Sequence, residues 1–129
     1  MNASGTFDVT LTPQPLAGES AMGSLALDKT FHGDLEATSQ GHMLAFNTTV
    51  KGSAGYVAME QITGTLGGRK GSFVLQHSGT MTKGTPRLEV TVVPDSGTDE
   101  LVGLSGSMKL DVSGDEHAYV FEYEMAESA

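Results

Sequence analysis

The sequence predicts an all-β protein, a small closed antiparallel barrel of eight strands with almost no helix. Three observations support this fold class. Apolar and polar residues alternate in many short segments, and Gly, a residue typical of turns, accounts for 17 of the 129 residues. No window of about 11 residues keeps the helical i, i+3, i+4, i+7 spacing of apolar residues without a Gly or Pro interrupting it. The chain is therefore expected to consist of strands joined by turns.

The first three expected strands are bounded by residues that break strands or form turns. In residues 6–12, Phe, Val and Leu alternate with Thr and Asp, and the strand is expected to stop at residues 13–15, which read Pro-Gln-Pro. The second strand covers residues 25–31, where Lys29 is the one polar residue among Leu and Phe side chains of the same parity. After a Gly-Asp turn, residues 35–50 form a longer third strand.

Five further strands complete the pattern. They are expected at residues 56–66, 71–82, 88–92, 105–112 and 117–125. Residues 67–70, 83–86 and 113–116 contain Gly and are typical of hairpin turns, so each joins two neighbouring antiparallel strands. Residues 94–97 begin a longer and irregular connection between the sixth and seventh strands.

Strands that follow one another through short connections favour an antiparallel meander. Closing eight such strands into a barrel removes both exposed sheet edges, and the interior then holds side chains or one small ligand. An open two-layer sandwich is the less favoured alternative, because no connection has the length of a Greek-key crossover. The length of 129 residues is that of a single domain, expected to span residues 1–129.

Composition and charge exclude several classes of partner. The chain carries 7 Lys and Arg against 16 Asp and Glu, a net charge of −9 at pH 7. Such an acidic chain has little affinity for nucleic acid or for an anionic membrane surface. There is no Cys, the four His residues lack metal-ligand spacing, and no cofactor motif is present, so neither a metal nor a cofactor is expected. The absence of a signal region or long apolar run indicates a cytoplasmic protein.

The central part of the chain resembles a family of bacterial proteins of unknown function. Residues 64–80, GTLGGRKGSFVLQHSGT, are similar to the signature of the DUF3224 family, and residues 29–34, 93–101 and 119–123 match it as well. The resemblance covers nearly the whole chain. It implies the small antiparallel barrel of the allene oxide cyclase-like fold, and it brings no assigned reaction, since a shared fold does not establish a shared activity.

The turn at residues 67–70 also predicts how the two strands beside it pair. A loop of two or four residues there makes the numbers of paired residues add to 137, so that Glu60 lies opposite His77 and Ile62 opposite Leu75. This face is mainly apolar and is expected to point inward. The residues expected on the inner face of the barrel are Ile62, Phe73, Leu75, Leu88, Val90, Phe121 and Tyr123.

Glu60 and His77 are the candidate catalytic residues, because a carboxylate and an imidazole within hydrogen-bonding reach on an apolar wall can exchange a proton with a bound molecule. Burial by itself raises the pKa of such a Glu, while a protonated His lowers it. The same pair can instead be a structural contact that sets strand register. The candidate ligand-binding residues are Tyr56, Ile62, Phe73, Leu75, Tyr119, Phe121 and Tyr123.

Three functions remain open at this level. The favoured one is a module that binds a small apolar or amphipathic molecule inside the barrel, with Glu60 and His77 as polar contacts. The alternative is an isomerase, cyclase or eliminase that uses Glu60 as general base in the same cavity. The third is a structural protein that associates with itself, and a homodimer or homotrimer is compatible with each of the three.

Overall fold

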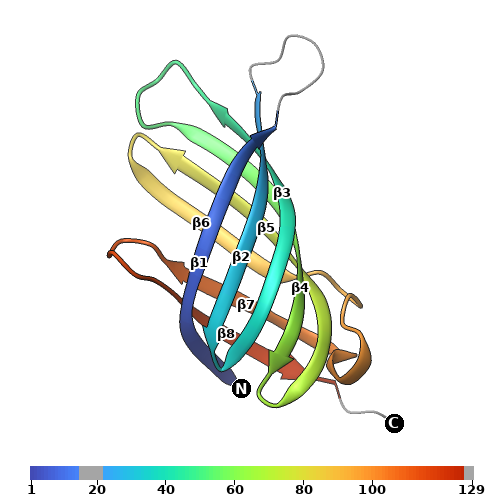
Figure 1. The fold of residues 1–129 in the computed structure, drawn as a ribbon. Coiled ribbons are helices and arrows are strands. Elements are labelled where there is room, and N and C mark those ends of the chain that lie inside the picture. The colour runs from blue at the N-terminus through green and yellow to red at the C-terminus, as the bar shows by residue number, and fades with distance from the viewer. Residues whose placement is uncertain (15–21, 127–129) are drawn as a thin grey trace.

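The computed structural model describes residues 1–14 and 22–126 and has eight antiparallel strands in one closed barrel (Figure 1). The elements are β1 (Asn2–Gln14), β2 (Met22–Gly33), β3 (Leu35–Asn47), β4 (Ala54–Leu66), β5 (Arg69–Thr82), β6 (Thr85–Val92), the 3-10 helix η1 (Asp99–Leu101), β7 (Leu104–Asp111) and β8 (His117–Met125). Each strand pairs with its neighbours in sequence, and β8 pairs with β1 to close the barrel. The predicted fold class, strand number and strand order are confirmed. No helix in the described residues is long and apolar enough to cross a membrane.

Two predicted strand ends are wrong for identifiable reasons. Pro13 was expected to stop the first strand, but it lies within β1, opposite Leu25 of β2. The pairing of β1 with β8 ends at Phe7, so Pro13 has a strand partner on one side only. On the side without a partner, the missing N–H of Pro13 costs no hydrogen bond between strands. The third strand ends at Asn47 instead of residue 50, because the Thr48 hydroxyl binds local backbone groups and starts a turn. Pro15 lies outside the described residues.

The turn between β4 and β5 corrects the predicted register. Gly67 and Gly68 have φ values of 55° and 85°, which Gly adopts without strain, and form a two-residue hairpin turn. Leu66 therefore pairs with Arg69, and the numbers of paired residues add to 135 instead of 137. Glu60 lies opposite Leu75 and not opposite His77. A shift of two residues keeps every side chain on the predicted face, so the inward face remains inward.

The apolar core fills the base of the barrel, the end that holds the Gly67-Gly68 turn and η1 (Figure 1, bottom). Of the residues expected on the inner face, Ile62, Phe73, Leu75, Val90 and Phe121 are buried there. Tyr123 is half-buried against this core, and Leu88 is 41% exposed. Leu88 has the same parity as Val90 but lies two residues nearer the opposite end of the barrel, which we call the mouth and which holds the turns at residues 48–53 and 83–84.

The barrel is closed least firmly between β6 and β7. These strands pair at one register position, Thr91 opposite Ser107, whereas β3 and β4 pair at every position from Leu35 to Asn47. Toward the mouth the two ribbons separate (Figure 1). The seam between β6 and β7 is therefore the weakest lateral contact of the barrel.

Amide hydrogens along this seam should exchange with solvent faster than those of the central strands. Residues 85–90 of β6 have strand partners in β5 only, while β4 is bonded on both sides, so β6 can open locally at a lower free energy. Hydrogen–deuterium exchange followed by mass spectrometry measures the difference. Equal protection of β6 and β4 would show that the seam is closed in solution.

Candidate functional site

Four buried polar side chains meet inside the barrel, one from each of four adjacent strands. They are Lys29 of β2, Ser39 of β3, Glu60 of β4 and His77 of β5, and they are all of the buried polar or charged residues in the described part of the chain. Their exposed fractions run from 0% for Glu60 to 6% for Lys29. We refer to these four residues as the polar cluster. Each of them faces inward, where the strands otherwise place apolar residues. The polar cluster therefore stands apart from the rest of the barrel interior.

Glu60 is the centre of the polar cluster. One carboxylate oxygen, Oε1, lies 2.8 Å from His77 Nε2 and 3.2 Å from Lys29 Nζ. The other oxygen, Oε2, accepts a hydrogen bond from the Ser39 hydroxyl. An ionised carboxylate can only accept hydrogen bonds, so His77 carries its proton on Nε2 in this contact. Both oxygens of the buried carboxylate are therefore satisfied by side chains of the protein.

The surroundings of Glu60 favour its ionised form. Burial alone raises the pKa of this carboxyl group, but the hydrogen bond from His77, the charge of Lys29 and the hydrogen bond from Ser39 outweigh burial and leave the pKa below its ordinary value. The Lys29 ammonium group is itself held over the rings of Phe7 and Phe31, 5.0 and 5.6 Å from their centroids. Glu60 and Lys29 thus form a buried ion pair with no net charge.

The predicted contact between Glu60 and His77 is present, although the two residues are diagonal neighbours and not directly opposite each other. Lys29 and Ser39 were missed as members of the site. Lys29 carried a signal, because it is the one polar residue of inward parity in β2, and such a residue needs a buried partner. Ser39 carried none, since a small hydroxyl residue is common on either face of a strand.

Above the polar cluster, the mouth of the barrel contains an apolar cavity of about 400 Å³, which we call the cup. Its lining comes from β3 to β7 and the residue that follows β7, and comprises Met43, Ala45, Ala54, Gly55, Tyr56, Gly79, Thr80, Met81, Pro86, Arg87, Leu88, Leu110 and Val112. Most of these side chains point inward and are apolar. The β6–β7 seam forms one side of the cup, so the cup opens where strand pairing is weakest.

Tyr56 connects the cup with the polar cluster. Its ring centroid lies 6.5 Å from that of His77, and the ring rests on Gly79, where a Cβ atom would overlap it. Burial and the charge of Glu60 raise the pKa of Tyr56, so that its hydroxyl stays protonated. Tyr56 therefore brings a hydrogen-bonding group to the cup beside a buried ion pair.

The predicted ligand-binding residues are divided between the cup and the base of the barrel. Tyr56 lines the cup, whereas Ile62, Phe73, Leu75 and Phe121 are packed in the apolar core with at most 1% exposure. Tyr123 stacks on Phe121 with ring centroids 5.2 Å apart. The structure thus brings Tyr56, Glu60 and His77 together and places the other predicted residues nearer the base.

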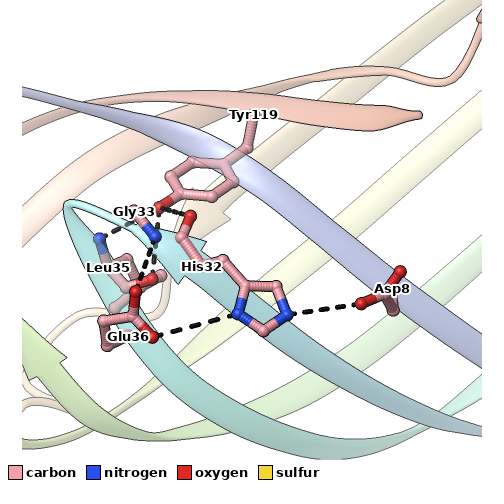
Figure 2. A network of polar contacts seen from close by, with 6 residues as sticks. All are labelled: Asp8, His32, Gly33, Leu35, Glu36 and Tyr119. Atoms are coloured by element: carbon pink, nitrogen blue, oxygen red, sulfur yellow. Dashed lines mark hydrogen bonds and ion pairs between the residues drawn. The ribbon is translucent and has the colours of Figure 1, made fainter.

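Tyr119 joins β8 to the turn between β2 and β3 at the base of the barrel (Figure 2). Its hydroxyl accepts a hydrogen bond of 2.9 Å from the Leu35 N–H and lies 3.0 Å from the His32 carbonyl oxygen, to which it can donate. Burial raises the pKa of Tyr119. The His32 imidazole, in contrast, lies at the surface between Asp8 and Glu36, 3.3 and 3.9 Å from their carboxylates. Tyr119 is therefore placed to stabilise the closure of the barrel, where β8 pairs with β1.

Replacing Tyr119 with Phe should lower the free energy of unfolding by about 1–3 kcal/mol, because the buried N–H of Leu35 then loses its acceptor. Chemical denaturation at neutral pH measures the loss. Tyr123→Phe is the matched control, since no hydrogen bond of the described structure uses the Tyr123 hydroxyl as donor or acceptor. If the two variants lost equal stability, the Tyr119 contact would have no special role.

Glu60 should also make the free energy of unfolding depend on pH under acidic conditions. Its pKa in the folded protein lies below the ordinary value of 4.5, so its stabilising contribution is fully present above that value and is lost as the pH falls through the folded-state pKa. The free energy of unfolding of the wild type should therefore fall more steeply below about pH 4.5 than that of Glu60→Gln. Denaturation curves at neutral and acid pH give both slopes, and identical slopes would contradict the assignment.

These features define a class: a small antiparallel barrel with a packed base, a buried ion-pair cluster and an apolar cup at its mouth. The chain belongs to the family described as protein of unknown function (DUF3224), whose model matches residues 3–123, and the resemblance noted from the sequence is confirmed. A crystal structure of a DUF3224 protein of unknown function from Shewanella oneidensis MR-1 is similar, with 50% sequence identity and a TM-score of 0.94. The match covers 99% of this chain and 98% of that chain. A search of the curated proteins finds none that matches.

Proposed function

We propose that the protein binds a small, uncharged, apolar or amphipathic molecule in the cup. The observation that carries the proposal is the cavity of about 400 Å³ at the mouth, with a mainly apolar lining. Ligand sites in proteins are concave, mostly apolar and about 300–1,000 Å³ in volume, with a few polar groups that orient the ligand. The cup has these properties.

Charge supports an uncharged ligand. Glu60 and Lys29 neutralise each other in the nearby polar cluster. Arg87, the charged residue of the cup lining, lies 3.4 Å from the Glu89 carboxylate, so the cup offers no unpaired charge to a charged head group. The Tyr56 hydroxyl is a polar group in the lining of the cup. It stays protonated and can donate a hydrogen bond to a carbonyl or hydroxyl oxygen of the ligand. In this proposal Glu60 and His77 influence the ligand indirectly, through the Tyr56 side chain and through the electrostatic field of the polar cluster.

A larger hollow of about 520 Å³ is a weaker candidate. It is lined mainly by outward residues of β1 to β4, together with the buried Lys29 and Ser39 that lie between them in β2 and β3. The outward residues are Asp8, Thr10, Asp28, Thr30, Thr38, Gln40, Gln61 and Thr63. Such a polar lining gives an apolar molecule little to bury against, because transfer of apolar surface from water provides most of the affinity.

The proposal gives Glu60 no part as a general base. A base needs a pKa near the working pH and an oxygen free to receive a proton. The pKa of Glu60 is lowered, and both of its oxygens accept hydrogen bonds from Lys29, His77 and Ser39. Binding without proton transfer is therefore the better supported of the two functions.

Titration with N-phenyl-1-naphthylamine, an uncharged dye that fluoresces in apolar surroundings, tests the proposal. The wild type should enhance the fluorescence with saturable binding. Leu110→Trp fills the cup with a larger side chain and should weaken the binding at least ~10-fold.

Lys109→Trp is the matched control, because Lys109 is the adjacent, exposed residue of β7 and faces away from the cup. It should bind the dye as the wild type does. A wild type that does not bind the dye, or two Trp variants with the same affinity, would remove the support for the cup as a ligand site. Native mass spectrometry of the freshly purified protein then identifies any bound natural molecule by its mass.

A further inference from the structure

The outer surface of the barrel carries an apolar patch over β3 and β4. Leu44, Phe46, Val57 and Met59 point outward and are 42%, 41%, 54% and 51% exposed. Leu44 lies directly opposite Val57 in the strand pairing, and Phe46 and Met59 are the next outward residues along β3 and β4. These four residues, which we call the outer patch, are contiguous on one sheet face. Side chains that point outward from a barrel strand into water are normally polar, while the inward ones are apolar. The four apolar side chains of the outer patch depart from this pattern.

The outward residues that surround the outer patch on β3 to β5 include no Asp, Glu, Lys or Arg. The outward residues of β3 between 38 and 46, of β4 between 55 and 65 and of β5 between 72 and 82 are Thr, Gln, His, Leu, Phe, Gly, Val, Met and Ser. The chain has 23 charged residues, the sum of 16 acidic and 7 basic ones, and a net charge of −9. Of the charged residues that the structure describes, Glu36 of β3 and Lys70 of β5 also point outward, but they lie nearer the base than these ranges. The outward residues within the ranges therefore form one neutral surface on three neighbouring strands.

We propose that this face of β3 to β5 is the interface of a symmetric dimer and that its occupant is a second copy of the same chain. A two-fold contact brings the same surface of both chains together, so a surface with a net charge would meet a surface with the same net charge. In a chain with a net charge of −9, a neutral face is the part of the surface that can meet its copy without repulsion. The Leu44 and Val57 pair then supplies the apolar centre, and the surrounding Thr, Gln and Ser form a polar rim.

The distribution of the remaining apolar residues favours a dimer over a trimer. A ring of three needs two different complementary surfaces on each chain, whereas a dimer needs one surface that fits itself. In the described part of the chain, Met22 of β2 lies opposite Phe46 and adjoins the outer patch. The other exposed large apolar residues lie at the mouth, near a chain end, or singly on the surface, as Val120 does on β8. The outer patch and its neutral surround therefore supply one such surface.

Sedimentation equilibrium at tens of micromolar protein tests the proposal. The wild type should have a mass of twice 13.4 kDa. Val57→Glu puts a charge at the centre of the outer patch and should raise the dissociation constant at least ~100-fold, because the charge loses its hydration without a partner. Val120→Glu adds the same charge at a valine that is 44% exposed on β8, and it should leave the dimer unchanged.

Met59→Lys separates a local effect from an effect of net charge. It should also dissociate the dimer, although it makes the chain less acidic and Val57→Glu makes it more acidic. Both residues are about half exposed, so the variants should fold, and far-UV circular dichroism verifies this. A monomeric wild type, a dimer that survives both substitutions, or equal dissociation by Val120→Glu would each overturn the proposal. A monomeric wild type would leave the outer patch to a different partner.

Discussion

Replacing Lys29 with Met should lower the free energy of unfolding by about 3–5 kcal/mol, the range measured when one partner of a buried ion pair is removed. Glu60 is fully buried, and Lys29 Nζ is 3.2 Å from its Oε1. Without the ammonium group, the carboxylate keeps its burial and loses the charge that offsets it. Met retains most of the length and apolar character of the Lys stem, so packing changes little. Urea denaturation at neutral pH measures the difference.

A double-mutant cycle with Glu60→Gln is the control for this prediction. Gln is uncharged and keeps hydrogen-bonding atoms, so the combination Lys29→Met/Glu60→Gln should be more stable than the sum of the two single losses predicts. The coupling should be about 0.5–3 kcal/mol, as expected for residues in one buried network. Strictly additive losses would mean that the two charges do not depend on each other in the folded protein.

Replacing Phe121 with Ala should cost about 3–5 kcal/mol, because the change leaves a large cavity in the packed base. Phe121 is 0% exposed and stacks on Phe73, with ring centroids 5.8 Å apart and planes 8° apart. The remaining core side chains are held by eight paired strands and cannot collapse far into the space. The same denaturation measurement applies.

Val120→Ala tests whether the large loss belongs to the inward face. Val120 precedes Phe121 in β8, points outward and is 44% exposed, so the change should shift the free energy of unfolding by less than about 0.5 kcal/mol. Comparable losses at the two neighbouring positions would contradict the assignment of inward and outward faces along β8.

The strands and their inward faces could be predicted because both depend on local patterns. Alternation with period two identifies which side chains share a face, and this was enough to place Glu60 and His77 on the inner wall. The register could not be predicted with the same certainty, because it depends on which residues of a Gly-rich turn are left unpaired. The Gly67-Gly68 turn is the tighter solution and moves the pairing by two residues. Parity survives this error because two is the period of a strand.

The polar cluster shows where local patterns stop being informative. Glu60 is 31 residues from Lys29 and 21 from Ser39 in the sequence. The meeting of the three depends on the combined registers of β2 with β3 and of β3 with β4. The lowered pKa of Glu60 follows from that meeting, since burial alone raises it. The cup likewise depends on how far the core fills the barrel and on the poorly paired β6–β7 seam.

The sequence by itself determined the fold class, the eight strands and the parity of their faces, because alternation and turn chemistry act over a few neighbouring residues. Only the tertiary structure decided which inward polar residues touch, how Glu60 is charged, where the interior stays open and which outer face is neutral. Each of these properties sums contributions from several strands, and small register shifts that leave the alternation pattern unchanged determine which side chains are brought together.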